Sequence, residues 1–317
     1  MRKSTAVCWG SFVLAGLLFF GPATFSRSGT QGVTPEAKTA YLAALRDASV
    51  SEPNEISRNL LAIVPFEDPV NTALLKGGSL VWEGEPGRSR LLVAAFMSRD
   101  SYDRYYRANL EAGLSEYTLT KSLWVTVVPE LRNFFWGEGL TPIWTAIPTP
   151  GRVKQILGLH PAYDYDVILE LFADPADLFR PSPDPEISDH EAELAYPGNG
   201  GEAWIFPRDA NPFLALRTDV YFKDSAWTQA LTYNEWFSAR ADTIYAIGDE
   251  NDPWSWGWPW TRLGYTYDWG NSIDHVGLSE FVLRIDPNRN GGEAVVRLVR
   301  AVDTASLEWV QYFAGKN

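Results

Sequence analysis

Apolar residues in this chain recur in short runs and in helical spacings, which predicts a fold with both strands and helices. The runs at 123–128 and 166–172 predict strands. The first is apolar on both faces and rich in β-branched residues, which is typical of a central strand. Thr-Pro pairs at 34–35 and 149–150 predict helix starts, since threonine caps a helix and proline suits its first turn. We also expect Asp100 to cap a helix.

Two pairs of apolar runs predict β-hairpins. Runs 79–83 and 90–96 flank a Gly/Pro turn, and runs 278–285 and 293–299 flank a glycine-rich turn near the end of the chain. Strands and helices are interspersed without regular βαβ spacing. The pattern therefore predicts an α+β fold: a single large domain with a mixed, mainly antiparallel sheet, flanked by helices and long irregular aromatic-rich loops.

One stretch, 252–270, fits no helical period, although residues 264–267 alternate as a strand would, with both tyrosines on one face. It carries five tryptophans and two tyrosines among glycines and prolines, which interrupt any helical spacing. Aromatic side chains on such a backbone either complete a core or form the floor of a ligand groove. Both interpretations stay open on the sequence alone.

The N-terminus has the layout of a secretory signal peptide. Arg2 and Lys3 precede an apolar run that ends at Phe20, and Ala23 follows as a small residue at a cleavage position. We expect a signal peptide at 1–23, a flexible leader at 24–33 and the folded domain at 34–317, in a secreted or periplasmic protein. An uncleaved anchor is the alternative. Cys8 is the only cysteine, so the exported chain has no disulfide and no thiolate chemistry.

Composition and charge narrow the classes of partner. A chain of 317 residues that is 45% hydrophobic can bury a large core. A net charge of −13 excludes the basic surface that nucleic acids or anionic membranes require. We expect a small-molecule or glycan ligand, no nucleic acid, and membrane contact only through an uncleaved N-terminal segment.

Metal-ligand patterns are weak. Asp189 and His190 lie in an acidic segment that could hold a divalent ion, but a solvated acidic loop is the competing interpretation. The segment 286–291 matches the first half of a calcium loop and lacks its final glutamate, so a hairpin turn explains it equally. No cofactor is strongly implied, and calcium or zinc stays open.

The sequence places the most favoured site in the aromatic stretch and its continuation. Aromatic faces suit sugar rings, and nearby charged groups can hold hydroxyls. The candidate ligand-binding residues are Trp254, Trp256, Trp258, Trp260, Arg262, Tyr265, Tyr267, Trp269 and His275. If the protein is a hydrolase, a carboxylate pair would combine one residue from each of two segments. These candidates are Asp184, Glu186, Asp268 and Asp274.

Three functions follow from these residues. The first is an exported protein that binds or hydrolyses a polar extracellular ligand, a glycan being the favoured class, in an aromatic groove. The second is a non-catalytic binding or scaffold domain whose aromatics form the core. The third is a metal-dependent hydrolase that uses His190 or His275. The chain has no Gly-x-Ser-x-Gly elbow and no phosphate-binding glycine loop, which removes most support for esterase and nucleotide-hydrolase activity.

Overall fold

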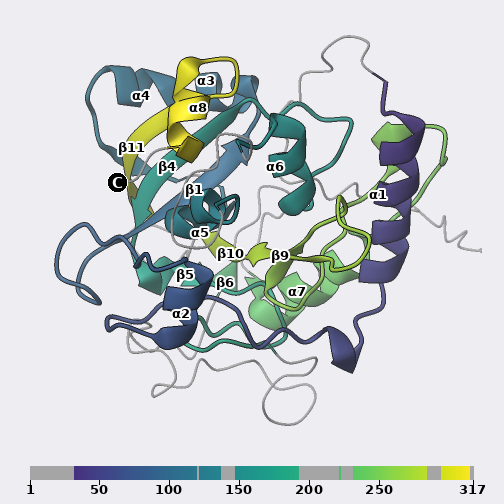
Figure 1. The fold of residues 1–317 in the computed structure, drawn as a ribbon, viewed down its shortest axis with the longest axis horizontal. Coiled ribbons are helices and arrows are strands. Elements are labelled where there is room, and N and C mark those ends of the chain that lie inside the picture. Colours follow the sequence, from purple (N-terminus) through teal and green to yellow (C-terminus); the bar gives the residue numbers. More distant parts are fainter. Residues whose placement is uncertain are drawn as a thin grey trace, which may run out of the picture.

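A seven-stranded sheet organises the fold, with its strands in the order β2–β11–β4–β1–β3–β10–β5 (Figure 1). All its described strand pairs are antiparallel. The computed structural model describes residues 32–119, 121–136, 147–192, 221–222, 231–283 and 294–314. The expected signal peptide, most of the leader and the calcium-like segment 286–291 lie outside these residues. The α+β architecture and its mainly antiparallel sheet are confirmed.

The strands of this sheet are β1 (Leu91–Met97), β2 (Glu116–Thr118), β3 (Leu123–Val127), β4 (Val167–Ala173), β5 (Leu178–Phe179), β10 (Phe281–Leu283) and β11 (Val295–Asp303). Two further antiparallel pairs are β6 (Tyr221–Phe222) with β7 (Leu231–Thr232), and β8 (Tyr265–Tyr267) with β9 (Val276–Ser279). The α-helices are α1 (Pro35–Ala48), α2 (Pro69–Leu74), α3 (Arg99–Tyr105), α4 (Arg107–Glu111), α5 (Val128–Asn133), α6 (Pro150–Ile156), α7 (Tyr233–Ala241) and α8 (Leu307–Ala314). Short 3₁₀ turns are η1 (Pro53–Glu55), η4 (Pro175–Asp177) and η5 (Pro253–Ser255).

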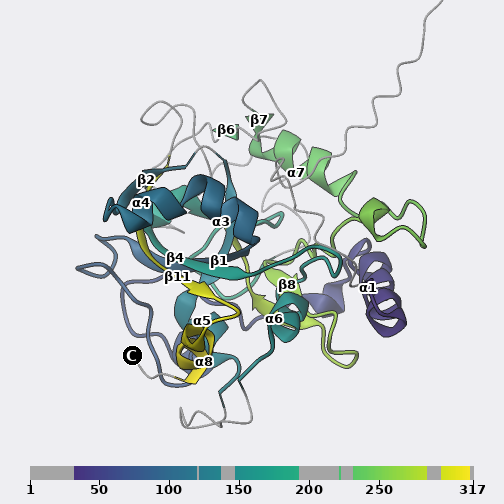
Figure 2. The ribbon, with the colours of Figure 1, turned by 90° about the horizontal axis from the view of Figure 1, so that it is seen from above.

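Helices cover both faces of the sheet. Helices α3 and α4 lie on one face, and α5 and α8 lie on the other (Figure 2). Strands β1 and β4 are buried along their whole length. The run at 123–128, predicted as a central strand from its two apolar faces, forms β3, which lies between β1 and β10 in the sheet. Alternate residues of β1 enter separate cores: Leu92 and Phe96 pack with α5 and α8, whereas Val93 and Met97 pack with α3.

Local capping signals set several helix starts. Thr34 Oγ1 accepts a hydrogen bond from Ala37 N at 3.2 Å, and Thr149 Oγ1 accepts one from Arg152 N at 3.2 Å. Both predicted starts are therefore confirmed. The predicted Asp100 cap is wrong, because Ser98 caps α3 instead and places Asp100 in the first turn.

Of the two predicted hairpins, the one at 79–83 and 90–96 forms over a few residues, and the terminal one does not form. Strand β10 pairs with β3 and β5, while β11 pairs with β4 and β2, so the two predicted terminal partners are separated by three strands. The run at 79–83 does pair with the start of β1 across the Gly/Pro turn: Trp82 bridges Leu91, Leu92 N donates to Val81 O at 2.9 Å, and Glu83 N donates to Arg90 O at 2.8 Å. Strand neighbours here are chosen by burial across the sheet rather than by closeness in sequence.

Strand β3 divides its hydrogen bonds between two neighbours. Its last residues pair with β1 at Thr126 opposite Ala94, while its first three residues pair with β10 on the other side. The ladder between β1 and β3 therefore stops at Ala94, and the two strands separate beyond it. This separation opens the interior next to Glu280, the single residue that links β9 to β10.

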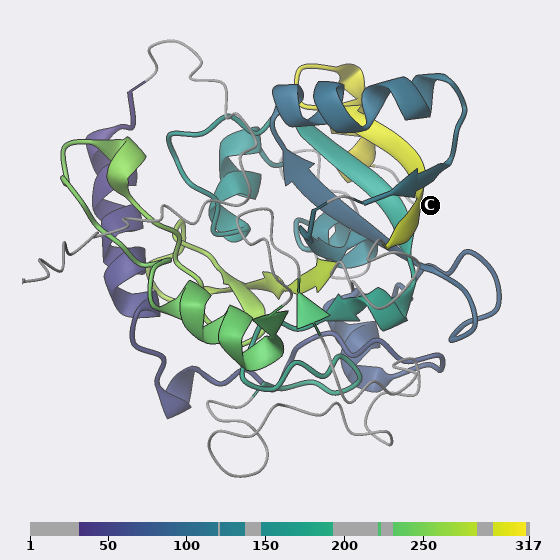
Figure 3. The ribbon, with the colours of Figure 1, turned by 180° about the vertical axis from the view of Figure 1, so that it is seen from behind.

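Part of the aromatic stretch holds α1 against the body of the protein (Figure 3). The rings of Trp256 and Trp269 pack with Tyr41, and the Tyr41 hydroxyl donates to Gly257 O at 2.8 Å. A Cβ atom on Gly257 would lie 1.8 Å from Ile244 O, so only glycine fits there.

We expect Gly257→Ala to destabilise the fold by about 3 kcal/mol or more, because the added methyl group overlaps a backbone carbonyl. Urea unfolding would measure the change. Gly151→Ala is the matched control: Gly151 lies in the first turn of α6, where a Cβ atom would meet only Thr149 Oγ1 at 3.8 Å. Equal stability of the two variants would contradict the packing described here.

Candidate functional site

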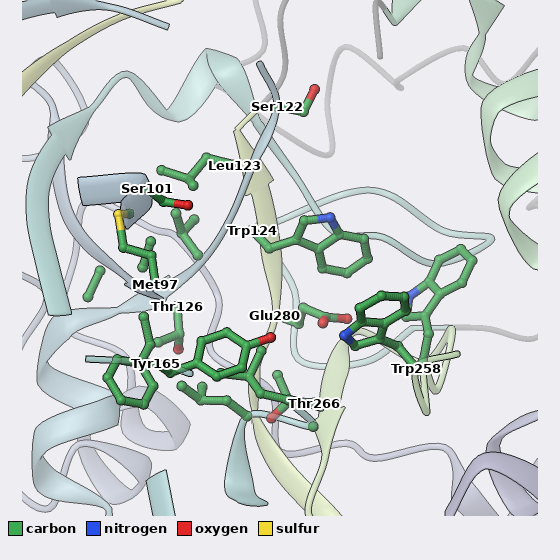
Figure 4. Close-up of a pocket in the computed structure, with 18 of the residues that line it drawn as sticks. Met97, Ser101, Ser122, Leu123, Trp124, Thr126, Tyr165, Trp258, Thr266 and Glu280 are labelled. Atoms are coloured by element: carbon green, nitrogen blue, oxygen red, sulfur yellow. The ribbon is translucent and has the colours of Figure 1, made fainter. Parts of the chain in front are cut away.

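The opening between β1 and β3 is a cavity of 210 Å³ with a mainly apolar lining. Its walls come from β1, β3, α3, α7, the aromatic stretch and Glu280, the single residue between β9 and β10. Figure 4 shows the aromatic side chains Trp124, Tyr165 and Trp258 around this space, with the Glu280 carboxylate among them. An acidic group thus faces a cavity built mostly of rings.

Glu280 is placed in the interior by strand alternation. Leu278 and Val282, two residues away on either side, belong to the same core, so Glu280 faces that core too. Its Oε2 atom is buried and has no hydrogen-bond partner among the described residues. Burial raises the pKa of Glu280 well above its usual range, and the positive charge of Arg240 opposes the shift only in part. An empty cavity therefore favours the protonated acid.

A second buried carboxylate fixes the backbone next to Glu280. Glu130, at the start of α5, accepts hydrogen bonds from Ser279 N at 3.0 Å and from Ser279 Oγ at 2.9 Å. Thr126 Oγ1 donates to Ser279 O at 3.0 Å. On the far side, Glu280 N donates to Gly264 O at 2.9 Å. These bonds hold the Glu280 side chain toward the cavity.

Tryptophans from three segments form the wall of the cavity near Glu280. The Trp260 ring meets Trp124 edge-on, at 6.0 Å between centroids, and meets Trp236 of α7 at 6.2 Å. The Arg240 guanidinium lies 5.7 Å from the centre of Trp124 and 5.4 Å from that of Trp236. The wall thus already carries one cation on its ring faces.

Comparisons with protein-family models, with curated proteins and with solved structures each gave no match. The chain's own geometry therefore has to carry any functional argument. Of the helices that the structure describes, none combines the length and the apolar character of a membrane span.

The five tryptophans of the aromatic stretch do not line one groove. Trp258 and Trp260 line the cavity, and Trp260 Nε1 also donates to Pro181 O at 3.1 Å. Trp256 and Trp269 instead pack against α1, with their indole groups donating to backbone carbonyls. Trp254 is half-buried against Tyr163, with ring centroids 5.1 Å apart.

The remaining predicted ligand-binding residues connect α1 and η1 to the strand pair β8–β9. Arg262 donates to Ser49 O at 3.0 Å, at the C-terminal end of α1. Tyr267 donates to Asp47 Oδ2 at 2.7 Å. Tyr265 donates to the backbone oxygen of Glu55 at 2.9 Å. Tyr267 also lines the cavity wall, whereas Arg262, Tyr265 and His275 do not belong to its described lining.

None of the four predicted catalytic carboxylates belongs to the described lining of the cavity. Asp268 is buried in a two-pronged ion pair with Arg152, with contacts of 2.6 and 2.5 Å. Asp274 is exposed and caps its own turn by accepting from Val276 N. Asp184 and Glu186 are buried in the segment that follows β5.

Asp184 and Glu186 lie around the fully buried Arg180. Burial raises the pKa of Glu186, and Arg180 opposes the shift. Arg180 also donates to Leu61 O at 3.1 Å and to Asp189 O at 3.0 Å. These contacts join the segment that follows β5 to the body of the protein. Asp184 and Glu186, which lie beside Arg180, therefore have a structural role.

The predicted metal ligands His190 and Asp189 already have partners within the protein. His190 Nδ1 lies 2.8 Å from Leu60 O, and its Nε2 lies 3.2 Å from Asp68 Oδ1. The Asp189 carboxylate lies 3.6 Å from Arg180.

A different set of donors converges elsewhere. Asp47, Glu55 and His275 place one donor atom each within 4.8 Å of one another. The His275 ring stacks on Tyr267 at 4.7 Å between centroids and on Tyr265 at 6.0 Å. His275 Nδ1 lies 3.7 Å from Asp47 Oδ2, so a protonated imidazole can also serve as the cation between these acids.

Sequence reasoning included Glu280 only as the end of the segment that continues the aromatic stretch and gave it no role, and it did not select Arg240 or Trp124. Glu280 had one recoverable signal: it is the acidic residue in the alternation Leu278–Glu280–Val282, where both neighbours are core residues. Arg240 and Trp124 meet only through tertiary packing, so no sequence spacing could connect them.

Loss of the Asp268–Arg152 pair should lower stability. We expect Asp268→Asn to cost about 1.5 kcal/mol in urea unfolding, because it removes charge-assisted hydrogen bonds to Arg152, whose side chain is 31% exposed and stays partly solvated. Asp274→Asn serves as the control, since its carboxylate is exposed, and should change stability by less than about 0.5 kcal/mol. Similar small effects for both variants would show that the pair contributes little.

Glu130 should make stability fall as pH rises. Burial raises the pKa of Glu130 to about 7, against the opposing hydrogen bonds from Ser279. Between the ordinary carboxyl pKa and about 7, the folded state holds a proton that the unfolded state has lost, so stability declines across that window and then levels.

The variant Glu130→Gln should lack the Glu130 part of this decline, on the order of 3 kcal/mol. Urea midpoints measured across the window in wild type and variant would test it. Parallel pH profiles would contradict the assignment. Asp274→Asn again provides the exposed-carboxylate control.

Proposed function

We propose that this protein binds a small polar ligand in the Glu280 cavity. The observation that carries the proposal is the carboxyl group of Glu280, which faces an aromatic-lined space. The residue as a whole is half-buried, but its Oε2 atom is buried and has no hydrogen-bond partner among the described residues. Buried polar groups in folded proteins are normally hydrogen-bonded, and each exception calls for an explanation. A ligand that bonds to Glu280 would supply one.

The size of the cavity supports a small ligand. At 210 Å³ it falls below the roughly 300–1,000 Å³ typical of sites for drug-sized molecules. A ligand of about one ring fits this space, whereas a polysaccharide chain would need an open groove. The sequence favours a glycan ligand, and a cavity of this size would hold a single sugar unit.

Binding is better supported than hydrolysis. A glycosidase of the common kind needs two carboxyl groups on either side of the scissile bond, and Glu280 is the only carboxyl group in the described lining. The scaffold alternative draws support from Trp256 and Trp269, which pack against α1. One part of the aromatic stretch thus packs against α1, and another part faces the cavity.

A ligand screen with a matched variant tests the proposal. The wild-type protein would be screened by thermal shift against single sugars, amino sugars, amino acids, amines and quaternary ammonium compounds. A ligand present at 100 times its Kd should stabilise the fold by about 2.7 kcal/mol. Tryptophan fluorescence would provide a second readout, because Trp124, Trp258 and Trp260 line the cavity.

The variant Glu280→Leu should raise the melting temperature and weaken ligand binding by about tenfold or more, since it replaces a buried unpaired acid with an apolar side chain. Asp274→Asn should bind as wild type does. The proposal fails if no compound in the screen binds, or if Glu280→Leu binds the hits unchanged.

A further inference from the structure

We propose that the ligand of the Glu280 cavity carries a positive charge, as an amine or a quaternary ammonium group held between the Glu280 carboxylate and the rings of Trp258 and Trp260. This inference rests on the proposed function and specifies the chemical class of its ligand. It depends on three features of the cavity: where its charges lie, what its rings favour, and what a buried acid requires.

The first feature is the distribution of charge. The titratable groups of the described lining are one acid, two bases and four tyrosines. They are Glu280, Arg240, Lys121, Tyr105, Tyr106, Tyr165 and Tyr267. Lys121 lies in a bend before β3, whereas Arg240 is the base whose charge acts on Glu280. The Lys121 ammonium group donates to Tyr105 at 3.2 Å. Near Glu280, the base in the lining is therefore Arg240.

The second feature is the aromatic wall. Aromatic faces carry partial negative charge and attract cations, and quaternary ammonium groups are bound in this way by cages of aromatic residues. Arg240 shows that this wall holds a cation, because its guanidinium lies over both Trp124 and Trp236. Trp258 and Trp260 line the same cavity, and Figure 4 shows Trp258 beside the Glu280 carboxylate.

The third feature is the cost of a buried carboxyl group. With a neutral ligand Glu280 would stay protonated, and the only contact it could gain is a hydrogen bond between two uncharged groups. A cationic ligand would form a charge-assisted contact and make the ionised form favourable. Arg240 repels a second cation, so the ligand charge belongs on the side of Glu280 that faces Trp258 and Trp260. Binding should therefore release a proton from Glu280.

A matched pair of probes separates charge from shape. Choline and neohexyl alcohol have the same outline, but a carbon atom replaces the charged nitrogen in the alcohol. Calorimetric titration of the wild-type protein should show choline binding about tenfold or more tighter than the alcohol. The affinity for choline should rise between about pH 5 and about pH 8, because Glu280 loses its proton more easily at higher pH. The affinity for the alcohol should not rise.

Two variants complete the test. Glu280→Gln should remove the preference for choline and its pH dependence, and Asp274→Asn should keep both. The inference is overturned if the alcohol binds as tightly as choline, if Glu280→Gln keeps the preference, or if neither probe binds while a neutral compound from the wider screen does. In each of these cases the cavity can still be a ligand site. Absence of binding by every compound would overturn the proposed function as well.

Discussion

The division of β3 between two partners is the constraint on which the rest of the site depends. Because β3 leaves β1 after Thr126 and continues along β10, the sheet opens without losing its hydrogen-bonded order. The opening exposes the end of β1 to the aromatic stretch and to α7, and Glu280, the single residue between β9 and β10, lies at its edge. A continuous ladder between β1 and β3 would leave no space for a ligand.

An arrangement of this kind is costly, and the surrounding contacts offset the cost. A buried carboxyl group is tolerated where its backbone is fixed and its neutral form is accessible. Glu130 and Thr126 hold Ser279 on one side, while Gly264 accepts from the Glu280 amide on the other. The aromatic wall adds apolar burial around a group that by itself disfavours folding.

The sequence could predict features that depend on neighbours along the chain. Thr34 and Thr149 cap helices as expected, and the apolar runs at 123–128 and 166–172 form β3 and β4. It could not predict the partners of β10 and β11, since pairing across the sheet is decided by burial between distant segments.

The site shows the same limit. The aromatic stretch stood out from composition alone, yet its tryptophans divide between two environments. Trp256 joins Tyr41 of α1, while Trp258, two residues later, faces the cavity. Glu280 gains its meaning only once the residues on either side of it are known to be buried.

The most direct test of this account is the protonation state of Glu280 in the ligand-free protein. Infrared difference spectra between wild type and Glu280→Gln at neutral pH isolate the contribution of this one carboxyl group. The account predicts that wild type shows a carbonyl band of a protonated carboxylic acid that the variant lacks. A carboxylate band in its place would mean that Glu280 is ionised and already paired within the protein, which would contradict its role as a waiting ligand group.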